Sequence, residues 1–329
     1  KIHHVNVMGA FTLESSNWTN DQQVATNFPD DLTGANDMGR ALDKATLSGD
    51  KGQQRLASFL GRVNYTLADK YILTASFRSD GSSKFTDENK WATFLSGALA
   101  WRASEEQFIK DLNIFSNLKF RISYGETGNQ GIGSYRINSQ LDTANFPFGG
   151  SLSSGAADVA WRGPVDPNIK WETTKQWNAG IDFGWFKNRL TLTVDFYWKK
   201  TRDLLQEVII APSNGFSNML TNTGNVTNKG LEITIGATPV DTKDWKWNLN
   251  GNIAFNKNSI GGLEGDQFAR TLWDGADNIF IQRNGCPIGA IYGYVEDGFY
   301  DNIQEVRADP QYTNAKDAVA LSKVGEIKY

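Results

Sequence analysis

The sequence predicts an all-β protein whose strands run up and down as an antiparallel sheet, and three observations lead to it. Apolar and polar residues alternate with period two in many segments, and few segments show the period of a helix. Aromatic residues make up 12% of the 329 residues, and Gly is frequent between the alternating runs. Long and short connections also alternate along the chain, as they do in sheets of consecutive hairpins.

The strands are expected in the following order. About ten are predicted, over residues 2–13, 58–67, 71–78, 91–102, 117–125, 171–185, 190–199, 229–237, 245–256 and 288–300. The clearest pair is the long hairpin of the sixth and seventh segments, in which apolar residues such as Ile181 alternate with polar residues such as Asp182. The best candidate for a helix is short, at 105–111.

The connections differ in length in a regular way. Three are short, at 68–70, 187–189 and 239–244, whereas five are long, at 14–51, 79–90, 126–170, 201–228 and 257–287. In an up-and-down sheet this alternation places every long loop at the same end. Outer-membrane barrels have short periplasmic turns and long extracellular loops, so the pattern favours that topology.

Period two alone does not separate a membrane barrel from a soluble sandwich, because both have one apolar face per strand. No uncharged apolar run approaches the roughly 18 residues that a transmembrane helix needs. Aromatic residues lie near the short turns, at the level of an interfacial girdle: Tyr65, Tyr71, Trp101, Trp185, Trp245 and Trp247. The opposite face is polar and would line a wet lumen. A closed transmembrane β-barrel is then required, since hydrocarbon cannot satisfy open strand edges.

Charge and composition exclude several classes of protein. With 33 Lys+Arg against 37 Asp+Glu, the chain carries a formal charge of −4 and lacks the basic stripe of a nucleic-acid binder. One Cys and two His leave no room for a zinc site made of these residues. No catalytic constellation, cofactor motif or metal signature is visible, so we expect no enzyme activity, no cofactor and no metal.

Several motifs of the sequence are familiar as an ordered set. They lie at residues 59–65, 73–85, 124–130, 171–176, 225–232 and 285–294. In this order they resemble the SusC/RagA family of TonB-dependent outer-membrane transporters. The resemblance runs from about residue 55 to the end of the chain, and the stretch at 71–85 is its most specific part.

The resemblance implies a 22-stranded barrel plugged by an N-terminal domain and driven through the TonB complex. It also implies a SusD-like surface lipoprotein that acts as a lid, and a location in the outer membrane of a Gram-negative, Bacteroidetes-like bacterium, among membrane lipid and lipopolysaccharide. Nothing in the chain resembles the plug, the TonB box, the first strands or the closing strands. We therefore expect residues 1–329 to form a middle portion of the barrel domain.

Two groups of residues are candidates for functional contacts. Alternation places four polar residues on the lumen face, where they contact the plug, bind an anionic solute or simply form local ion pairs: Arg62, Arg78, Arg121 and Asp182. Six aromatic residues fall in long loops, where they stack on sugar rings, bury peptide side chains or pack against a lid: Tyr135, Phe146, Phe148, Trp161, Phe216 and Trp273.

The expected function is import of oligosaccharides or oligopeptides together with a SusD-like partner. Two alternatives belong to other classes. A secreted carbohydrate-binding or glycan-cleaving β domain would be soluble without detergent and would have short strands. A structural component of the envelope would share the barrel without transporting anything.

Overall fold

The computed structural model describes residues 2–32, 36–43, 46–138, 141–148, 151–158, 164, 166–211, 213, 216, 218–269 and 279–328, with only the backbone at 141–148 and 151–158. The chain divides into two compact units, 1–263 and 264–329. Among the described residues, no helix has both the length and the apolar character to cross a membrane.

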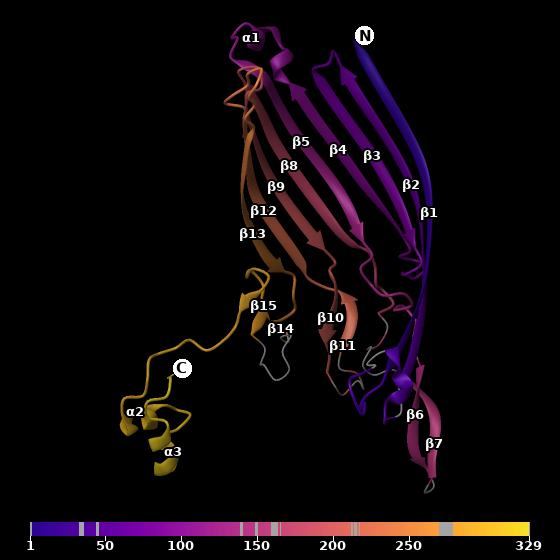
Figure 1. Ribbon diagram of the computed structural model, residues 1–329, viewed down its shortest axis with the longest axis vertical. Helices are drawn as coiled ribbons and strands as arrows, with labels where there is room; N and C mark the ends of the chain where they lie inside the picture. Colours follow the sequence, from indigo (N-terminus) through magenta and orange to yellow (C-terminus); the bar gives the residue numbers. More distant parts are fainter. Residues whose placement is uncertain are drawn as a thin grey trace. The chain divides into compact units, whose positions relative to one another are not determined.

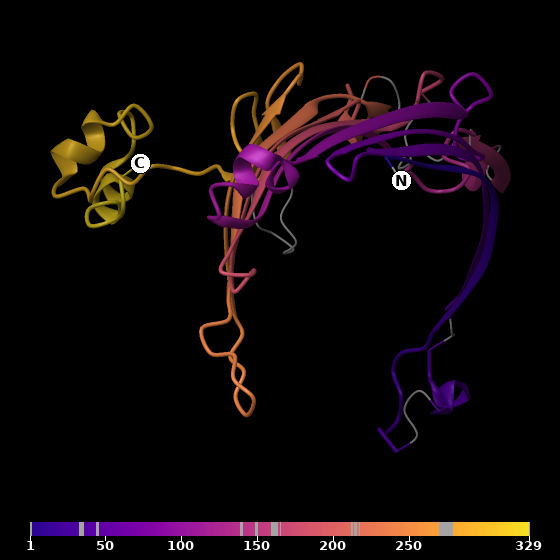
Figure 2. The same cartoon turned by 90° about the horizontal axis from the view of Figure 1, so that it is seen from above.

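The first unit is built on one nine-stranded sheet in which each strand pairs antiparallel with the next strand of the sheet (Figure 1). Its strands are β1 (His3–Val24), β2 (Thr46–Leu67), β3 (Tyr71–Ser82), β4 (Trp91–Arg102), β5 (Phe115–Asn129), β8 (Glu172–Trp185), β9 (Leu190–Arg202), β12 (Asn225–Ala237) and β13 (Leu249–Gly261). Figure 2 shows that this sheet is strongly curved. The prediction of an up-and-down antiparallel barrel sheet is confirmed, including the hairpin of β8 and β9.

Short connections gather at one end of the sheet (Figure 1). Two of them turn through left-handed backbone, with positive φ at Ala68, Asp69, Phe186, Lys187 and Asn188. The connection from β4 to β5 is longer and contains a 3-10 turn, η3 (Ala103–Glu105), and a short helix, α1 (Gln107–Lys110). The helix expected at 105–111 is therefore present.

Long connections gather at the other end and carry structure of their own. They hold a 3-10 turn, η2 (Met38–Arg40), and two extra hairpins, β6 (Leu141–Phe148) with β7 (Ser151–Asp158) and β10 (Leu205–Ile209) with β11 (Asn218–Asn222). The predicted first strand is too short, since β1 and β2 are each 22 residues long and pair as far as Val24 and Thr46. The sequence of this extension is mostly polar, so it shows no alternation that would predict a strand. Within it, the indole of Trp18 lies over Gly52, where the Cβ of any other residue would clash with the ring.

A small apolar core lies at the long-loop end, where loop residues pack against the strands. It consists of Phe85, Phe94, Ile132, Ile169 and Trp171. The indole of Trp171 packs against Phe85 with ring centroids 5.1 Å apart and donates a hydrogen bond to the Lys90 carbonyl at 3.1 Å. Apolar burial thus fixes the course of these loops.

The second unit contains β14 (Gln267–Ala269), β15 (Phe280–Gln282), β16 (Ala290–Ile291), α2 (Ile303–Ala308) and α3 (Asp317–Ser322), with a core of Tyr300, Val306 and Ala320. The strand predicted at 288–300 is not a strand of the large sheet. Only β16 and a single bridge at Phe299 lie within it, and Gly289 and Gly298 adopt positive φ that interrupts an extended strand.

Candidate functional site

The two faces of the large sheet differ in chemistry, as strand register shows. One row across five neighbouring strands is wholly apolar: Leu73, Leu99, Ile122, Ala179 and Phe196. Leu99 and Phe196 keep 56% and 51% of their surface exposed. Because no other part of the sheet covers the side chains of this row, their exposed apolar surface suits contact with lipid. We call this the outward face and the opposite one the inward face.

A compact ion cluster lies in the middle of the inward face, where Arg121 stands opposite Gly180 and Gly180 opposite Asp195. The guanidinium donates to both carboxylate oxygens of Asp182, at 2.8 and 2.9 Å, and to Asp195 at 3.2 Å. Thr193 donates a further hydrogen bond to Asp182 at 3.2 Å. One Arg thus holds two carboxylates on the wall, leaving the cluster with net negative charge.

Gly180 makes room for this cluster. A Cβ built at this position would lie 2.3 Å from an Asp195 carboxylate oxygen and 2.7 Å from an Arg121 nitrogen. Sequence reasoning placed Arg121 and Asp182 on the lumen face but missed Asp195 and Gly180. The same alternation in the seventh predicted strand would have shown Asp195 to share that face.

Nearer the long loops, the inward wall holds a hollow of about 460 Å³. Arg78 donates twice to the Asp80 carboxylate at 2.8 Å and once to the Ser58 hydroxyl at 3.2 Å. Arg62 also lines this hollow. Within the part of the chain that the structure describes, no ion pair or hydrogen bond engages the Arg62 side chain, so its guanidinium is available to another molecule or domain.

The stretch at 71–85 has a structural role beside the hollow. The hydroxyl of Ser82, fully buried, donates to the Gln130 side chain, and the Ser83 hydroxyl accepts a hydrogen bond from the Arg55 backbone at 2.9 Å. Phe85 enters the apolar core. The stretch therefore ties three segments together at the long-loop end.

The loop aromatics are only partly described. Tyr135 has positive φ and is 44% exposed, and Phe216 is half-buried. Phe146 and Phe148 lie on β6, of which the structure gives the backbone, whereas Trp161 and Trp273 lie outside the described residues. Their role in binding stays a prediction. In the described part of the chain, no group of three or more His, Cys, Asp and Glu residues is placed to hold a metal ion.

Comparison with known families and proteins gives a consistent result. Residues 3–315 match the family described as TonB dependent receptor-like, beta-barrel. The chain is 39% identical over 253 residues to the TonB-dependent receptor SusC of Bacteroides thetaiotaomicron, covering 74% of this chain and 25% of SusC. It is 35% identical over 273 residues to TonB-dependent receptor P26 of Formosa agariphila, covering 83% of this chain and 27% of that receptor.

Solved structures agree on the fold. The RagAB peptide importer in its open-open state matches with a TM-score of 0.74 and 24% identity, over 91% of this chain and 32% of the matched chain. The chain spans about a quarter of the length of its curated relatives. The expected resemblance is therefore confirmed, and so is the location in the outer membrane. The chain belongs to the TonB-dependent receptor-like β-barrel family and forms part of a SusC-type outer-membrane barrel.

Proposed function

We propose that the complete protein imports nutrient oligomers, either oligosaccharides or oligopeptides, across the outer membrane. The observation that carries this proposal is the 39% identity to a TonB-dependent receptor over most of the chain. The inward wall supports it, because its ionic and polar side chains suit a water-filled path rather than a dry core. The proteins of this family are transporters, which argues against the alternative of a secreted glycan-cleaving domain.

The proposal includes two partners outside this chain. Energy would come from the TonB complex through a plug domain, since the relatives are named as TonB-dependent receptors. A SusD-like lipoprotein would cover the extracellular mouth. The apolar core at the long-loop end supports this second partner, because a docking surface is better defined when the loops have a core of their own.

Within this function, the hollow on the inward wall would receive an anionic group of the plug or of the solute. Arg62 supplies the free guanidinium, while Arg78 is already held by Asp80. A guanidinium binds carboxylate with two parallel hydrogen bonds, so either an acidic side chain or a peptide C-terminus suits it. The exposed loop aromatics, including Tyr135, would contact the solute or the lid.

Uptake assays test the proposal. A strain that lacks the gene would be grown on defined glycans or on defined peptides as the limiting nutrient, and uptake of the labelled oligomer would be measured with and without the complete gene. Loss of uptake of one class and its restoration by the gene would support import and name the substrate. Unchanged uptake of both classes would favour the alternative of a structural envelope component.

The Arg62 proposal needs its own variant. Arg62→Gln removes the charge from the inward wall, and Lys243→Gln serves as the control because it removes a charge from an exposed turn at the short-turn end. We expect Arg62→Gln to lower uptake while Lys243→Gln leaves it unchanged. Equal uptake by both variants at equal surface abundance would remove Arg62 from the pathway.

A further inference from the structure

The connection from β4 to β5, residues 103–114, folds onto the outward side of the sheet at the short-turn end. Leu118 of β5 pairs with Phe183 and belongs to the outward face, yet it is only 6% exposed. The turn η3 packs against β5, and its Ala103 is 1% exposed. A few residues would be enough to connect two neighbouring antiparallel strands, so this connection is longer than the turn itself requires.

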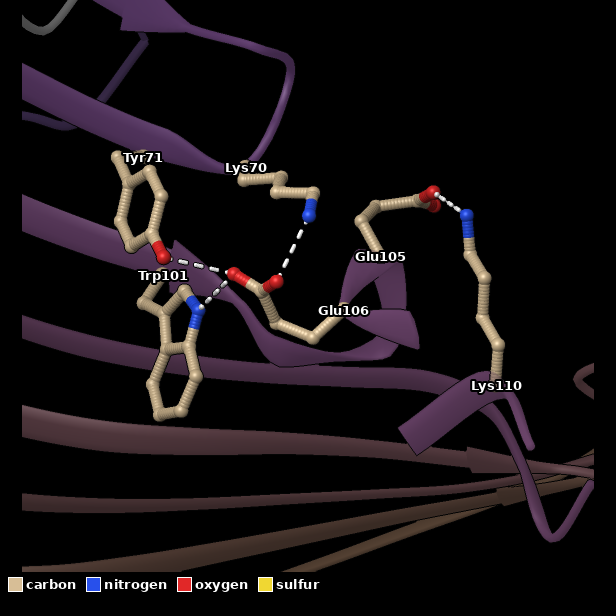
Figure 3. A network of polar contacts seen from close by, with 6 residues as sticks. All are labelled: Lys70, Tyr71, Trp101, Glu105, Glu106 and Lys110. Atoms are coloured by element: carbon tan, nitrogen blue, oxygen red, sulfur yellow. Dashed lines mark hydrogen bonds and ion pairs between the residues drawn. The ribbon is translucent and has the colours of Figure 1, made fainter. Parts of the chain in front are cut away.

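The carboxylate of Glu106 fixes this position (Figure 3). It accepts hydrogen bonds from Lys70 Nζ at 2.7 Å, from the Tyr71 hydroxyl at 2.7 Å and from the Trp101 indole at 3.3 Å. Tyr71 and Trp101 are directly paired across β3 and β4 on the outward face. The connection is thus attached to the outward aromatic rim and not to the lumen wall. Hydrogen bonds from Lys70 and then from Tyr71 lower the pKa of Glu106 to about 2.

Three large apolar side chains on the connection have no cover within the described structure. Phe108, Leu112 and Ile114 keep 60%, 54% and 55% of their surface exposed. Phe186, in the neighbouring short turn, is 73% exposed. Apolar side chains gathered in this way on a single short segment are unusual where water is the only surrounding.

Two of the acidic side chains on the connection form local ion pairs. Lys110 pairs with Glu105 at 2.7 Å, and Lys70 pairs with Glu106 (Figure 3). Asp111 accepts a hydrogen bond from the neutral Gln107 side chain at 2.8 Å and has no ion-pair partner among the described residues. With two ion pairs and one unpaired carboxylate among the described residues, the segment offers no excess of positive charge to an anionic surface. Its affinity would come from apolar burial, which suits a zwitterionic lipid surface.

We propose that residues 103–114 form an interfacial anchor whose Phe108, Leu112 and Ile114 insert into the phospholipid of the periplasmic leaflet. Lipid is the expected surrounding because the segment is hydrogen-bonded to the outward rim of an outer-membrane barrel, directly beside side chains that face lipid. Aromatic residues with one polar atom, as in Tyr71 and Trp101, favour that depth of the bilayer. The anchor fixes the height of the barrel in the membrane at its periplasmic end.

The test uses the complete protein with Cys286 and any further cysteine replaced by Ser, reconstituted in phosphatidylcholine vesicles. The dye nitrobenzoxadiazole is attached at Phe108→Cys and, in a separate control protein, at Asp87→Cys, whose native side chain is 94% exposed in a long loop. Spin-labelled lipid with the nitroxide near the headgroup reports lipid contact, and aqueous iodide reports water contact. We expect several-fold stronger lipid quenching at 108 than at 87, and the reverse for iodide.

Two outcomes would overturn the anchor. Iodide quenching at 108 equal to that at 87 would place the segment in water. Protection from both quenchers would mean that protein covers it, either a periplasmic partner or another part of the complete chain. A label at Leu112→Cys, which lies on the same segment, repeats the measurement if the first site perturbs folding, and it must give the same pattern.

Discussion

The two ends of the large sheet are stabilised in different ways. At the short-turn end, left-handed turns and one carboxylate with three donors hold the connections, and apolar side chains such as Phe108 stay exposed. At the long-loop end, apolar side chains such as Phe85 and Trp171 are buried against each other. Local turns and polar contacts thus dominate at the short-turn end, and an apolar core forms at the long-loop end.

The difference follows from entropy and from surroundings. A turn of three or four residues has little conformational freedom to lose, so local backbone geometry is enough to fix it. A loop of tens of residues must offset a larger entropy loss by burying its own apolar surface. The exposed apolar groups of the short-turn end do not contradict this, because lipid rather than water is their proposed surrounding.

The largest effect is expected from removing the core of the long-loop end. Trp171 is 6% exposed, so Trp171→Ala should cost about 3–5 kcal/mol of local stability by leaving a cavity and removing the indole hydrogen bond to the Lys90 carbonyl. Hydrogen exchange should show faster exchange at 83–90 and 130–138, with the strands still protected. The control is Tyr135→Ala at the same end, whose side chain is exposed. Equal exchange in both variants would mean that the loops do not depend on this core.

A smaller loss of stability is expected from a substitution in the middle of the sheet, where the strands cross the bilayer. Ile181 lies on the outward face, so Ile181→Lys should cost about 2–4 kcal/mol near the bilayer midplane. Ile181→Leu is the control and should be nearly silent, because lipid accepts either aliphatic side chain. Equilibrium refolding of the complete barrel into lipid vesicles measures both. A silent Ile181→Lys would show that the two faces are assigned the wrong way round.

The smallest effect concerns Glu106 and depends on pH. Its pKa in the folded protein, about 2, lies below the ordinary 4.5, so its stabilising contribution is complete above pH 4.5 and is lost as the pH falls toward 2. Wild type should therefore exceed Glu106→Gln in stability at neutral pH, and the gap should narrow on acidification. Refolding midpoints in urea from pH 7 to about pH 3 measure it.

Glu105→Gln is the matched control for this pH dependence. The pKa of Glu105 is also lowered, first by its hydrogen bond to Lys110, but its carboxylate is more exposed and accepts from Lys110 alone among the described side chains, whereas Glu106 has three donors. The difference in stability between wild type and Glu105→Gln should be smaller than that between wild type and Glu106→Gln at every pH measured. A gap that widens on acidification in the Glu106 variant would mean that the carboxylate is not held in its charged form.

Much of the wall was predictable from residues near each other in the chain. Period-two alternation identified the hairpin of β8 and β9 and placed Ile181 and Asp182 on opposite faces. It failed at two places. The long extension of β1 is polar on both faces and so has no apolar signal, and the segment at 288–300 alternates in part but is interrupted by glycines with positive φ.

The sequence by itself determined the class of fold, the inward and outward faces of the strands and the family, because alternation and motif order are local properties of the chain. Tertiary structure alone decided which groups meet. Arg121 binds Asp182 and Asp195, which lie 61 and 74 residues further along the chain, and Glu106 reaches back to Lys70. Such partners follow from strand register and from the path of the connections, which many distant backbone hydrogen bonds set together.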